Sequence, residues 1–342
     1  MALSMLHTRS ILSVGLLAVT FGCGGSQPPA DQAPQPPASS IAPAPVESTQ
    51  SPPAEAKAPE PPKEEKPAAP TPVFRIAEGV NTPESVLYDE ANDRYLVSNI
   101  NGKPDEADNN GYIMEVSPEG KVLKPKFIAG GQDKVKLDAP KGTGIAGGIL
   151  YVADISVVRK FDLKTGAPKG EIPVPGATFL NDIAVAKDGR VFVSDSGIKS
   201  GAKGFDPTGT DAVYVIEKNG KLKPVAKSKD LGGPNGLLVV DKGVLVVTFG
   251  TNELYRLDDK GVKQDVTKLP GGALDGIVDV GGDQLLVTSW EKSAIFKGTL
   301  GGTFVVALPE LKGPADIGFD SKRKRVLVPR FLDNAVEVYD LK

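Results

Sequence analysis

Residues 233–250 read GPNGLLVVDKGVLVVTFG, in which two short β-branched runs are separated by an Asp-Lys-Gly turn. This pattern is typical of two antiparallel strands joined by a hairpin. The motif that opens the segment occurs six times in variant form. Its versions are Pro83-Glu84-Ser85-Val86, Pro140-Lys141-Gly142-Thr143, Leu180-Asn181-Asp182-Ile183, Pro234-Asn235-Gly236-Leu237, Leu274-Asp275-Gly276-Ile277 and Pro314-Ala315-Asp316-Ile317. The segment is therefore one unit of a repeat.

The spacing of the motif predicts the architecture. Its second residues are 57, 40, 54, 40 and 40 residues apart, and each motif is followed by a second, a third and usually a fourth strand-like run. Glycines are abundant, and no stretch shows helical periodicity over three turns. Six units of about four strands predict an all-β fold, a six-bladed β-propeller over residues 73–342. The two long intervals indicate insertions between second and third strands, at Ile100–Gly111 and Gly197–Asp211.

The first 23 residues have the character of a targeting segment. The apolar run Ile11–Phe21 is too short to span a membrane and matches a secretory signal. Cys23 follows it, as in a bacterial lipoprotein signal, although Phe21 stands where that pattern prefers a small residue. We expect residues 1–22 to be a lipoprotein-type signal peptide and Cys23 to be lipidated. The protein would then be exported and anchored by lipid to the bacterial cell envelope. An ordinary secretion signal is the alternative.

Residues 23–72 have the composition of a linker. Half of the prolines, 15 of 30, lie between Pro28 and Pro72, among Ala, Glu, Gln and Ser. Such a segment buries too little apolar surface to offset the entropy lost on ordering. The sequence predicts a disordered, Pro-rich tether with an upper reach of about 150 Å.

Two scarce residue types exclude several kinds of site. The only histidine, His7, and the only cysteine, Cys23, both precede the predicted propeller. Disulfides, Cys or His zinc sites and Ser–His–Asp triads are therefore excluded from that domain. Residues 73–342 contain 36 Lys and Arg against 37 Asp and Glu without a basic stripe, which argues against nucleic-acid binding. We expect the domain to be a monomer.

Propeller symmetry brings equivalent residues of all six units together around one axis. The second motif residues are Glu84, Lys141, Asn181, Asn235, Asp275 and Ala315. Four of them carry side-chain oxygens, and two carboxylates with two amides suit a hard divalent cation, Ca²⁺ above all. The alternative is that Asn and Asp occupy these places for turn chemistry alone. That explains one or two such residues better than four in register.

The same four residues carry a resemblance to a known family. Glu84 in Thr-Pro-Glu-Ser, Asn181 in Leu-Asn-Asp-Ile, Asn235 in Gly-Pro-Asn-Gly-Leu and Asp275 in Leu-Asp-Gly-Ile resemble motifs of the regucalcin/gluconolactonase/LRE-like family, to which diisopropyl fluorophosphatase is related. The resemblance covers about residues 76–342. It implies a six-bladed propeller with a divalent cation, usually Ca²⁺, held by these side chains. It also implies that Asp275 is both ligand and general base or nucleophile, with sugar lactones or organophosphates as substrates. Phe179 stands where family lactonases have a substrate-binding arginine.

These observations lead us to expect a cation-dependent hydrolase of a lactone or related ester. The cation would act as a Lewis acid, while Asp275 activates water or attacks the substrate directly. Lys141 would bind an anionic substrate or an oxyanion, or else pair with Asp154 or Asp316. The ends of the second strands form a second ring, which we expect to form the pocket wall, and all of its members except Phe249 are expected to bind substrate. Its members are Asn99, Asp154, Asp195, Phe249, Trp290 and Arg330. Trp290, the only tryptophan, would stack on the substrate or pack within a blade.

A non-enzymatic function is the competing hypothesis. In it, a lipid-anchored propeller uses Ca²⁺ for rigidity and binds a ligand or a partner protein in the cell envelope. The acidic insertion Asp105–Asn110 fits this hypothesis if it holds a second, weaker cation, and is otherwise a solvated loop. Calcium-dependent turnover of lactones or phosphotriesters would separate the two classes.

Overall fold

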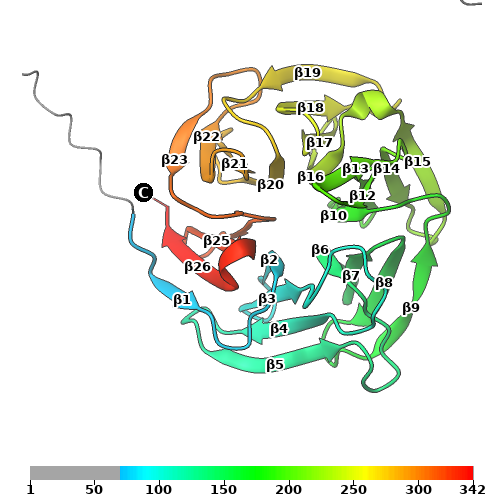
Figure 1. Ribbon diagram of the computed structural model, residues 1–342, viewed down its shortest axis with the longest axis vertical. Coiled ribbons are helices and arrows are strands. Elements are labelled where there is room, and N and C mark those ends of the chain that lie inside the picture. The colour runs from blue at the N-terminus through cyan, green and yellow to red at the C-terminus, as the bar shows by residue number, and fades with distance from the viewer. Residues whose placement is uncertain (1–69, 342) are drawn as a thin grey trace, which may run out of the picture. The chain divides into compact units, whose positions relative to one another are not determined.

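The computed structural model describes residues 70–341. They form six four-stranded antiparallel sheets arranged as blades around a central axis, as Figure 1 shows. This confirms the predicted all-β, six-bladed propeller. The predicted signal peptide, Cys23 and residues 23–69 of the predicted tether lie outside the described residues. Within the described range, no helix is long and apolar enough to cross a membrane.

The first three blades follow one another along the chain, each built from its innermost strand outward. Blade 1 contains β2 (Pro83–Asp89), β3 (Arg94–Asn99), β4 (Tyr112–Val116) and β5 (Val122–Ala129). Blade 2 contains β6 (Pro140–Ala146), β7 (Ile149–Asp154), β8 (Val157–Asp162) and β9 (Pro168–Pro173). Blade 3 contains β10 (Leu180–Val185), β11 (Val191–Asp195), β14 (Ala212–Ile216) and β15 (Leu222–Lys227). Between β11 and β14 lies a separate hairpin, β12 (Ile198–Gly201) with β13 (Gly204–Pro207), inside the predicted second insertion.

The last blade is completed by the N-terminal strand of the domain. Blade 4 contains β16 (Pro234–Val240), β17 (Gly243–Thr248), β18 (Glu253–Leu257) and β19 (Lys263–Lys268), preceded by the 3-10 turn η1 (Lys229–Leu231). Blade 5 contains β20 (Leu274–Asp279), β21 (Leu285–Ser289), β22 (Ala294–Gly298) and β23 (Val305–Leu308). Blade 6 contains β24 (Gly318–Asp320), β25 (Arg325–Arg330), the 3-10 turn η2 (Phe331–Asp333), β26 (Ala335–Asp340) and, outermost, β1 (Phe74–Ile76). The antiparallel pairing of β1 with β26 closes the ring.

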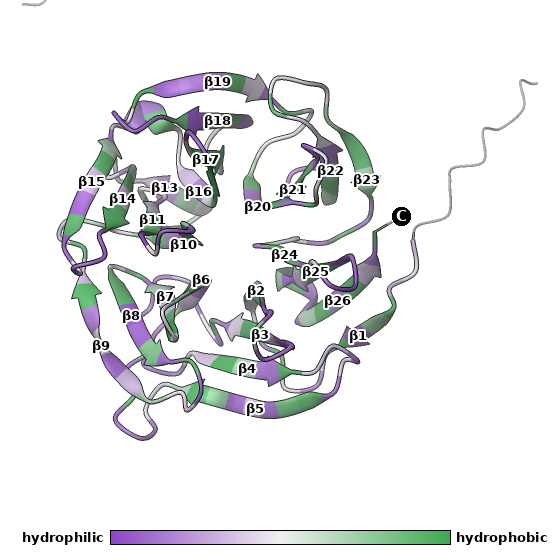
Figure 2. Cartoon of the chain, turned by 180° about the vertical axis from the view of Figure 1, so that it is seen from behind, coloured by the Kyte–Doolittle hydropathy of each residue, from purple (hydrophilic) through white to green (hydrophobic). Residues whose placement is uncertain are grey.

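The hydrophobic core consists of layers between neighbouring blades. The described residues form six core clusters, and each joins two adjacent blades. In β17, Val244 and Val246 pack toward blade 3, whereas Leu245 and Val247 pack toward blade 5. Because alternate residues of a strand point to opposite faces, a strand buried on both faces has a continuous apolar run. Along the outermost strands, hydrophilic and hydrophobic residues are mixed, as Figure 2 shows for β5, β9 and β15.

The innermost strands begin with an irregularity that positions the motif residues. In β10 the pairing with β11 shifts between Leu180 and Ile183, and β2, β6, β16 and β20 show the same irregularity. Such a bulge re-aims side chains out of the regular ladder. The backbone N–H of Asp182 donates instead to the hydroxyl of Ser194 at 2.9 Å. The bulge is therefore supported by a side chain of the next strand.

Glycine follows the motif residue where two inner strands approach closely. A Cβ on Gly236 would lie 2.2 Å from the carbonyl oxygen of Asp275, and one on Gly276 would lie 2.4 Å from the backbone nitrogen of Ile317. Real Cβ atoms do not approach other atoms so closely. Glycine at these positions thus allows the blades to converge on the axis.

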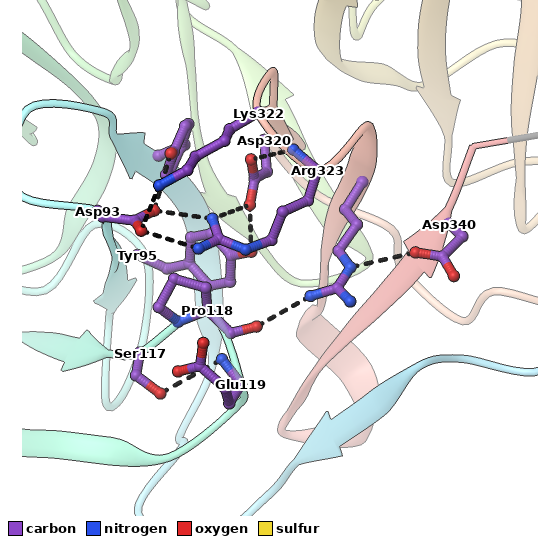
Figure 3. A network of polar contacts seen from close by, with 11 residues as sticks. Asp93, Tyr95, Ser117, Pro118, Glu119, Asp320, Lys322, Arg323 and Asp340 are labelled. Carbon is purple, nitrogen blue, oxygen red and sulfur yellow. Dashed lines mark hydrogen bonds and ion pairs between the residues drawn. The ribbon is translucent and has the colours of Figure 1, made fainter.

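A polar network joins the first and last blades at the turns between their first and second strands, as Figure 3 shows. Arg323 donates from Nη1 and Nη2 to Asp93, at 2.7 and 2.8 Å, and also reaches Asp320 at 3.0 Å. Asp320 accepts a further hydrogen bond from the hydroxyl of Tyr95 at 2.7 Å. Asp93 and Tyr95 belong to blade 1, whereas Asp320 and Arg323 belong to blade 6. The network therefore strengthens the same junction that β1 and β26 close.

Candidate metal centre

Of the six residues at the second position of the repeated motif, five line one cavity. Glu84, Lys141, Asn181, Asn235 and Asp275 surround a cavity of about 40 Å³. Each is at most 5% exposed to solvent. The structure thus brings together the four predicted cation ligands and the lysine, from blades 1 to 5.

The four predicted ligands share an unusual feature. Among residues 70–341, nine buried side-chain nitrogen or oxygen atoms have no hydrogen-bond partner, and four of them belong to this one cavity. These four are Glu84 Oε2, Asn181 Oδ1, Asn235 Oδ1 and Asp275 Oδ1. Buried polar atoms are nearly always paired in folded proteins, so four unpaired oxygens in one place require an explanation. A bound cation would satisfy all of them.

Hydrogen bonds hold the two amides with their oxygens free. Asn181 donates from Nδ2 to the hydroxyl of Ser196 at 3.0 Å, and that hydroxyl donates to the carbonyl of Pro234 at 2.7 Å. Asn235 donates from Nδ2 to the carbonyl of Leu274 at 3.3 Å. Because each nitrogen has its partner, each Oδ1 is left as the free acceptor. Outer contacts of this kind orient metal ligands.

Asp275 is held in a similar way by the only tryptophan. Its Oδ2 accepts a hydrogen bond from Trp290 Nε1 at 2.7 Å, and its Oδ1 is free. Burial raises the pKa of Asp275 to about 7, although the indole bond acts in the opposite direction. Burial, assisted by the charges of Asp275 and Asp316, also raises the pKa of Glu84 well above its ordinary value. Both carboxylates thus carry an electrostatic penalty that a divalent cation would relieve.

Lys141 lies in the same cavity without an ion pair to either predicted partner. Its Nζ donates to the carbonyl of Ala139 at 3.1 Å and lies 4.3 Å from the ring centroid of Phe179. Asp154 pairs instead with Arg159, and Asp316 accepts from Ser85. Burial lowers the pKa of Lys141, while Glu84 acts in the opposite direction. The side chain thus supplies an ammonium group that forms no ion pair with Asp154 or Asp316.

The donor set fits a hard cation. Two carboxylates and two amide oxygens supply four ligands, and Ca²⁺ takes six to eight oxygens, the remainder being water or substrate. Within residues 70–341, no group of three or more Asp, Glu, His or Cys side chains is placed to hold a metal. The amide oxygens are therefore essential to the candidate centre. The site contains neither the thiolates nor the imidazoles that zinc prefers.

The second ring of predicted residues is only partly brought to the cavity. Phe249 and Trp290 line it. In the described chain, four other members do not line it, and their polar groups have structural partners: Asn99 with Asn81, Asp154 with Ala139 and Arg159, Asp195 with Phe179 and Gly197, and Arg330 with Glu337. Direct substrate contact by these four stays a prediction. Their side chains turn back to fix the loops around the strand ends.

Aromatic residues of the cavity mouth form a continuous chain that sequence reasoning missed. We call Phe179, Phe205, Phe249, Trp290 and Phe331 the aromatic collar; all five line the cavity. Successive ring centroids are 5.5, 5.9, 6.1 and 5.0 Å apart. Four of the five adjoin inner or second strands, and the fifth, Phe205, lies on the inserted hairpin. Only the strand-end spacing of Phe249 and Trp290 hinted at this arrangement.

The two insertions meet beside this mouth. Pro104 of the first insertion and Ile198 of the hairpin both line the cavity. Asp105 accepts two hydrogen bonds from Ser200, from its backbone N–H and its hydroxyl, both at 2.6 Å. Asp108 is bonded within its own loop to Asn110, so the acidic residues of this insertion do not form a cluster. Within the described residues, this geometry fits the solvated-loop alternative better than a second cation.

A further pair of acidic residues, one position after the motif residues, lies at another cavity of about 270 Å³. Asp182 accepts from the backbone N–H groups of Ile183 and Leu237, both at 2.6 Å, and Asp316 accepts from the Ser85 hydroxyl at 2.6 Å. Burial raises the pKa of both carboxyls, that of Asp182 to about 6. In the sequence, both aspartates occupy the third position of the repeated motif, which is the pattern by which they could have been found.

Comparison with known proteins supports the architecture. No family model and no curated protein sequence matches the chain. Among solved structures, a gluconolactonase from Xanthomonas campestris is 19% identical over 77% of this chain and 87% of its own, with a TM-score of 0.57. A luciferin-regenerating enzyme is 15% identical over 78% and 93%, with a TM-score of 0.57. Virginiamycin B lyase from Staphylococcus aureus is 15% identical over 79% and 98%, with a TM-score of 0.52. These similarities establish the fold.

Proposed function

We propose that this protein is a Ca²⁺-dependent hydrolase of lactones or related esters. The observation that carries the proposal is the set of four unpartnered, buried oxygens on Glu84, Asn181, Asn235 and Asp275 around one cavity. The gluconolactonase among the structural neighbours has the same fold, which is consistent with this activity.

The residues that line the cavity would have distinct chemical roles. The four oxygens would hold the cation. A bound Ca²⁺ supplies Lewis acidity toward a carbonyl oxygen. Asp275 has one oxygen fixed by Trp290 and the other free, so it is the candidate for removing a proton from water or for attacking the carbonyl itself. A fixed carboxylate reacts from one defined position.

Lys141 is the candidate for stabilising negative charge. Lys141 is 1% exposed, and its ammonium group donates to the Ala139 carbonyl, which leaves further N–H donors. A donor that is already oriented in a water-poor cavity stabilises a developing oxyanion without having to reorganise. The same group would attract an anionic substrate.

The test is calcium titration calorimetry together with lactone and phosphotriester hydrolysis, with and without Ca²⁺. We expect binding of Ca²⁺ by the full chain and hydrolysis that requires it. Asp275→Asn should abolish turnover, whereas Asp279→Asn, on the exposed end of the same strand, should leave it unchanged.

Two outcomes would count against the proposal. Absence of calcium binding would remove its basis. Calcium binding that raises the melting temperature, without turnover of any compound in the panel, would indicate the non-enzymatic scaffold instead.

A further inference from the structure

The chemistry of the cavity changes sharply between its floor and its mouth. The floor contains the four oxygen ligands and Lys141, which are its polar groups. Every other described residue that lines the cavity is apolar: the aromatic collar, together with Ile100, Pro104 and Ile198. The one polar atom of the collar, Trp290 Nε1, already donates to Asp275. Among the described residues that line the cavity, the mouth therefore offers a ligand body no free hydrogen-bonding side chain.

Four of the five collar rings are also open to a ligand, whereas Phe179 is buried. Phe205 is 39% exposed, although it is a large apolar side chain, and Phe249, Trp290 and Phe331 are half-buried. Exposed apolar surface that is gathered around a cavity marks a binding site more often than a structural feature. Edge-to-face aromatic contacts hold the rings, so the surface is preorganised.

From this geometry we infer that the site takes lipophilic lactones or esters and rejects polyhydroxylated sugar lactones. The inference rests on the proposed function for the reacting group, but not for the ligand body. An alkyl or aryl body would bury apolar area against the collar. Each hydroxyl of a sugar lactone would instead lose its water without gaining a partner, which is unfavourable.

A matched pair of δ-lactones tests the inference in turnover. δ-Decalactone carries an alkyl chain on the ring that is to be opened, whereas D-glucono-δ-lactone carries hydroxyls. We expect kcat/KM with Ca²⁺ to be higher for δ-decalactone by about 100-fold, the discrimination typical of one unpaired hydroxyl in an apolar pocket. Equal or better turnover of the sugar lactone would overturn the inference.

Binding provides a readout that does not depend on catalysis. Trp290 is the only tryptophan of the chain and lies in the collar, so its fluorescence reports ligand in the mouth. The probes are the corresponding lactams, 6-pentylpiperidin-2-one and D-gluconolactam, which are hydrolysed far more slowly. We expect a saturable change with the alkyl lactam only. A response to gluconolactam of similar affinity, or no response to either lactam, would overturn the inference even if lactones are hydrolysed. A response to the alkyl lactam without lactone turnover would support it while counting against the proposed activity.

A collar variant locates the effect. Phe205→Ser removes an exposed ring whose side-chain contacts include Phe179 and Phe249, so folding should be preserved. We expect the lactam Kd and the KM for δ-decalactone to rise about tenfold, with kcat unchanged, because apolar contact area is lost. Val305→Ser is the control, at a 60% exposed position on β23, the outermost strand of blade 5. It should change neither the lactam Kd nor the KM. Equal behaviour of the two variants would place the ligand body outside the collar.

Discussion

Trp290 donates its indole N–H to Oδ2 of Asp275 at 2.7 Å, while Oδ1 of the same carboxylate has no partner. The Trp290 side chain therefore has two roles. Its ring belongs to the aromatic collar, in contact with Phe249 and Phe331, and its nitrogen orients a candidate cation ligand. The indole N–H thereby links the collar to the candidate metal centre.

The variant Trp290→Phe separates these tasks, because it keeps an aromatic ring and removes the donor. We expect Ca²⁺ affinity to fall by about tenfold, the lower end of the range for loss of an outer hydrogen bond to a metal ligand. Calorimetric titration measures it. Phe249→Leu, which alters the collar without touching Asp275, is the control and should retain the affinity of the native protein. Equal affinity of all three proteins would mean that the indole bond does not orient the ligand.

Calcium affinity should depend on pH in a defined direction. Burial raises the pKa of Asp275 to about 7 in the cation-free site and raises that of Glu84 as well. Below these values the free site holds protons that the cation must displace, so affinity should fall as the pH falls and level off once both groups are ionised. We expect a loss of up to about tenfold per pH unit for each proton displaced. Calorimetry in two buffers of different ionisation enthalpy measures both Kd and proton release, and a pH-independent Kd without proton release would contradict the expectation.

The repeat made the fold predictable, except where strands that are far apart in the sequence pair with each other. Pro234-Asn235-Gly236-Leu237 and its counterparts marked the start of each unit, because turn chemistry and β-branched runs are local signals. The pairing of β1 with β26 joins Phe74 to Val338. The three residues of β1 are far from β26 in the sequence, and no local pattern identifies β26 as their pairing partner. The closure of blade 6 was therefore visible only in the structure.

The candidate site was predictable where the symmetry of the propeller determines which residues face the axis. Glu84, Asn181, Asn235 and Asp275 share one register position, and symmetry alone requires them to converge. The second ring shares a position too, yet nearby partners decide where each side chain turns: Arg159 binds Asp154, and Glu337 binds Arg330. Competition with such partners depends on side-chain geometry, which a register argument does not contain.

The network between blades 1 and 6 predicts an unequal effect of two similar substitutions. Tyr95 is 1% exposed and donates to the fully buried Asp320, so Tyr95→Phe leaves a buried carboxylate oxygen with fewer partners. We expect a loss of about 2 kcal/mol of unfolding free energy, measured by urea denaturation. Tyr88→Phe is the matched control, because Tyr88 donates to Asp93, whose side chain is 38% exposed and can be rehydrated. Equal losses in the two variants would show that burial of the acceptor is unimportant.

Lipidation of Cys23 remains a proposal that rests on the sequence. Because Cys23 follows the apolar segment after a single glycine, we expect the full chain expressed in a bacterium to incorporate labelled palmitate and to sediment with membranes. Cys23→Ser should lose both properties while the propeller remains folded. Ser26→Ala, three residues further on, should retain both. Palmitate incorporation into the Cys23→Ser protein would contradict the proposal, since the chain has no other cysteine.

The contact between the insertions predicts how the mouth of the cavity moves. Asp105 binds both the N–H and the hydroxyl of Ser200, and the hairpin that carries Ser200 also carries the collar residue Phe205. Asp105→Ala removes both hydrogen bonds, so amide hydrogen exchange should become faster in residues 198–207, whose other restraints include the β12–β13 pairing and the ring contacts of Phe205. Asp108→Ala is the matched control, because Asp108 bonds to Asn110 within its own loop and should not affect the hairpin. Exchange in 198–207 that is unchanged by Asp105→Ala, or equally accelerated by Asp108→Ala, would show that the Asp105–Ser200 contact does not hold the hairpin over the site.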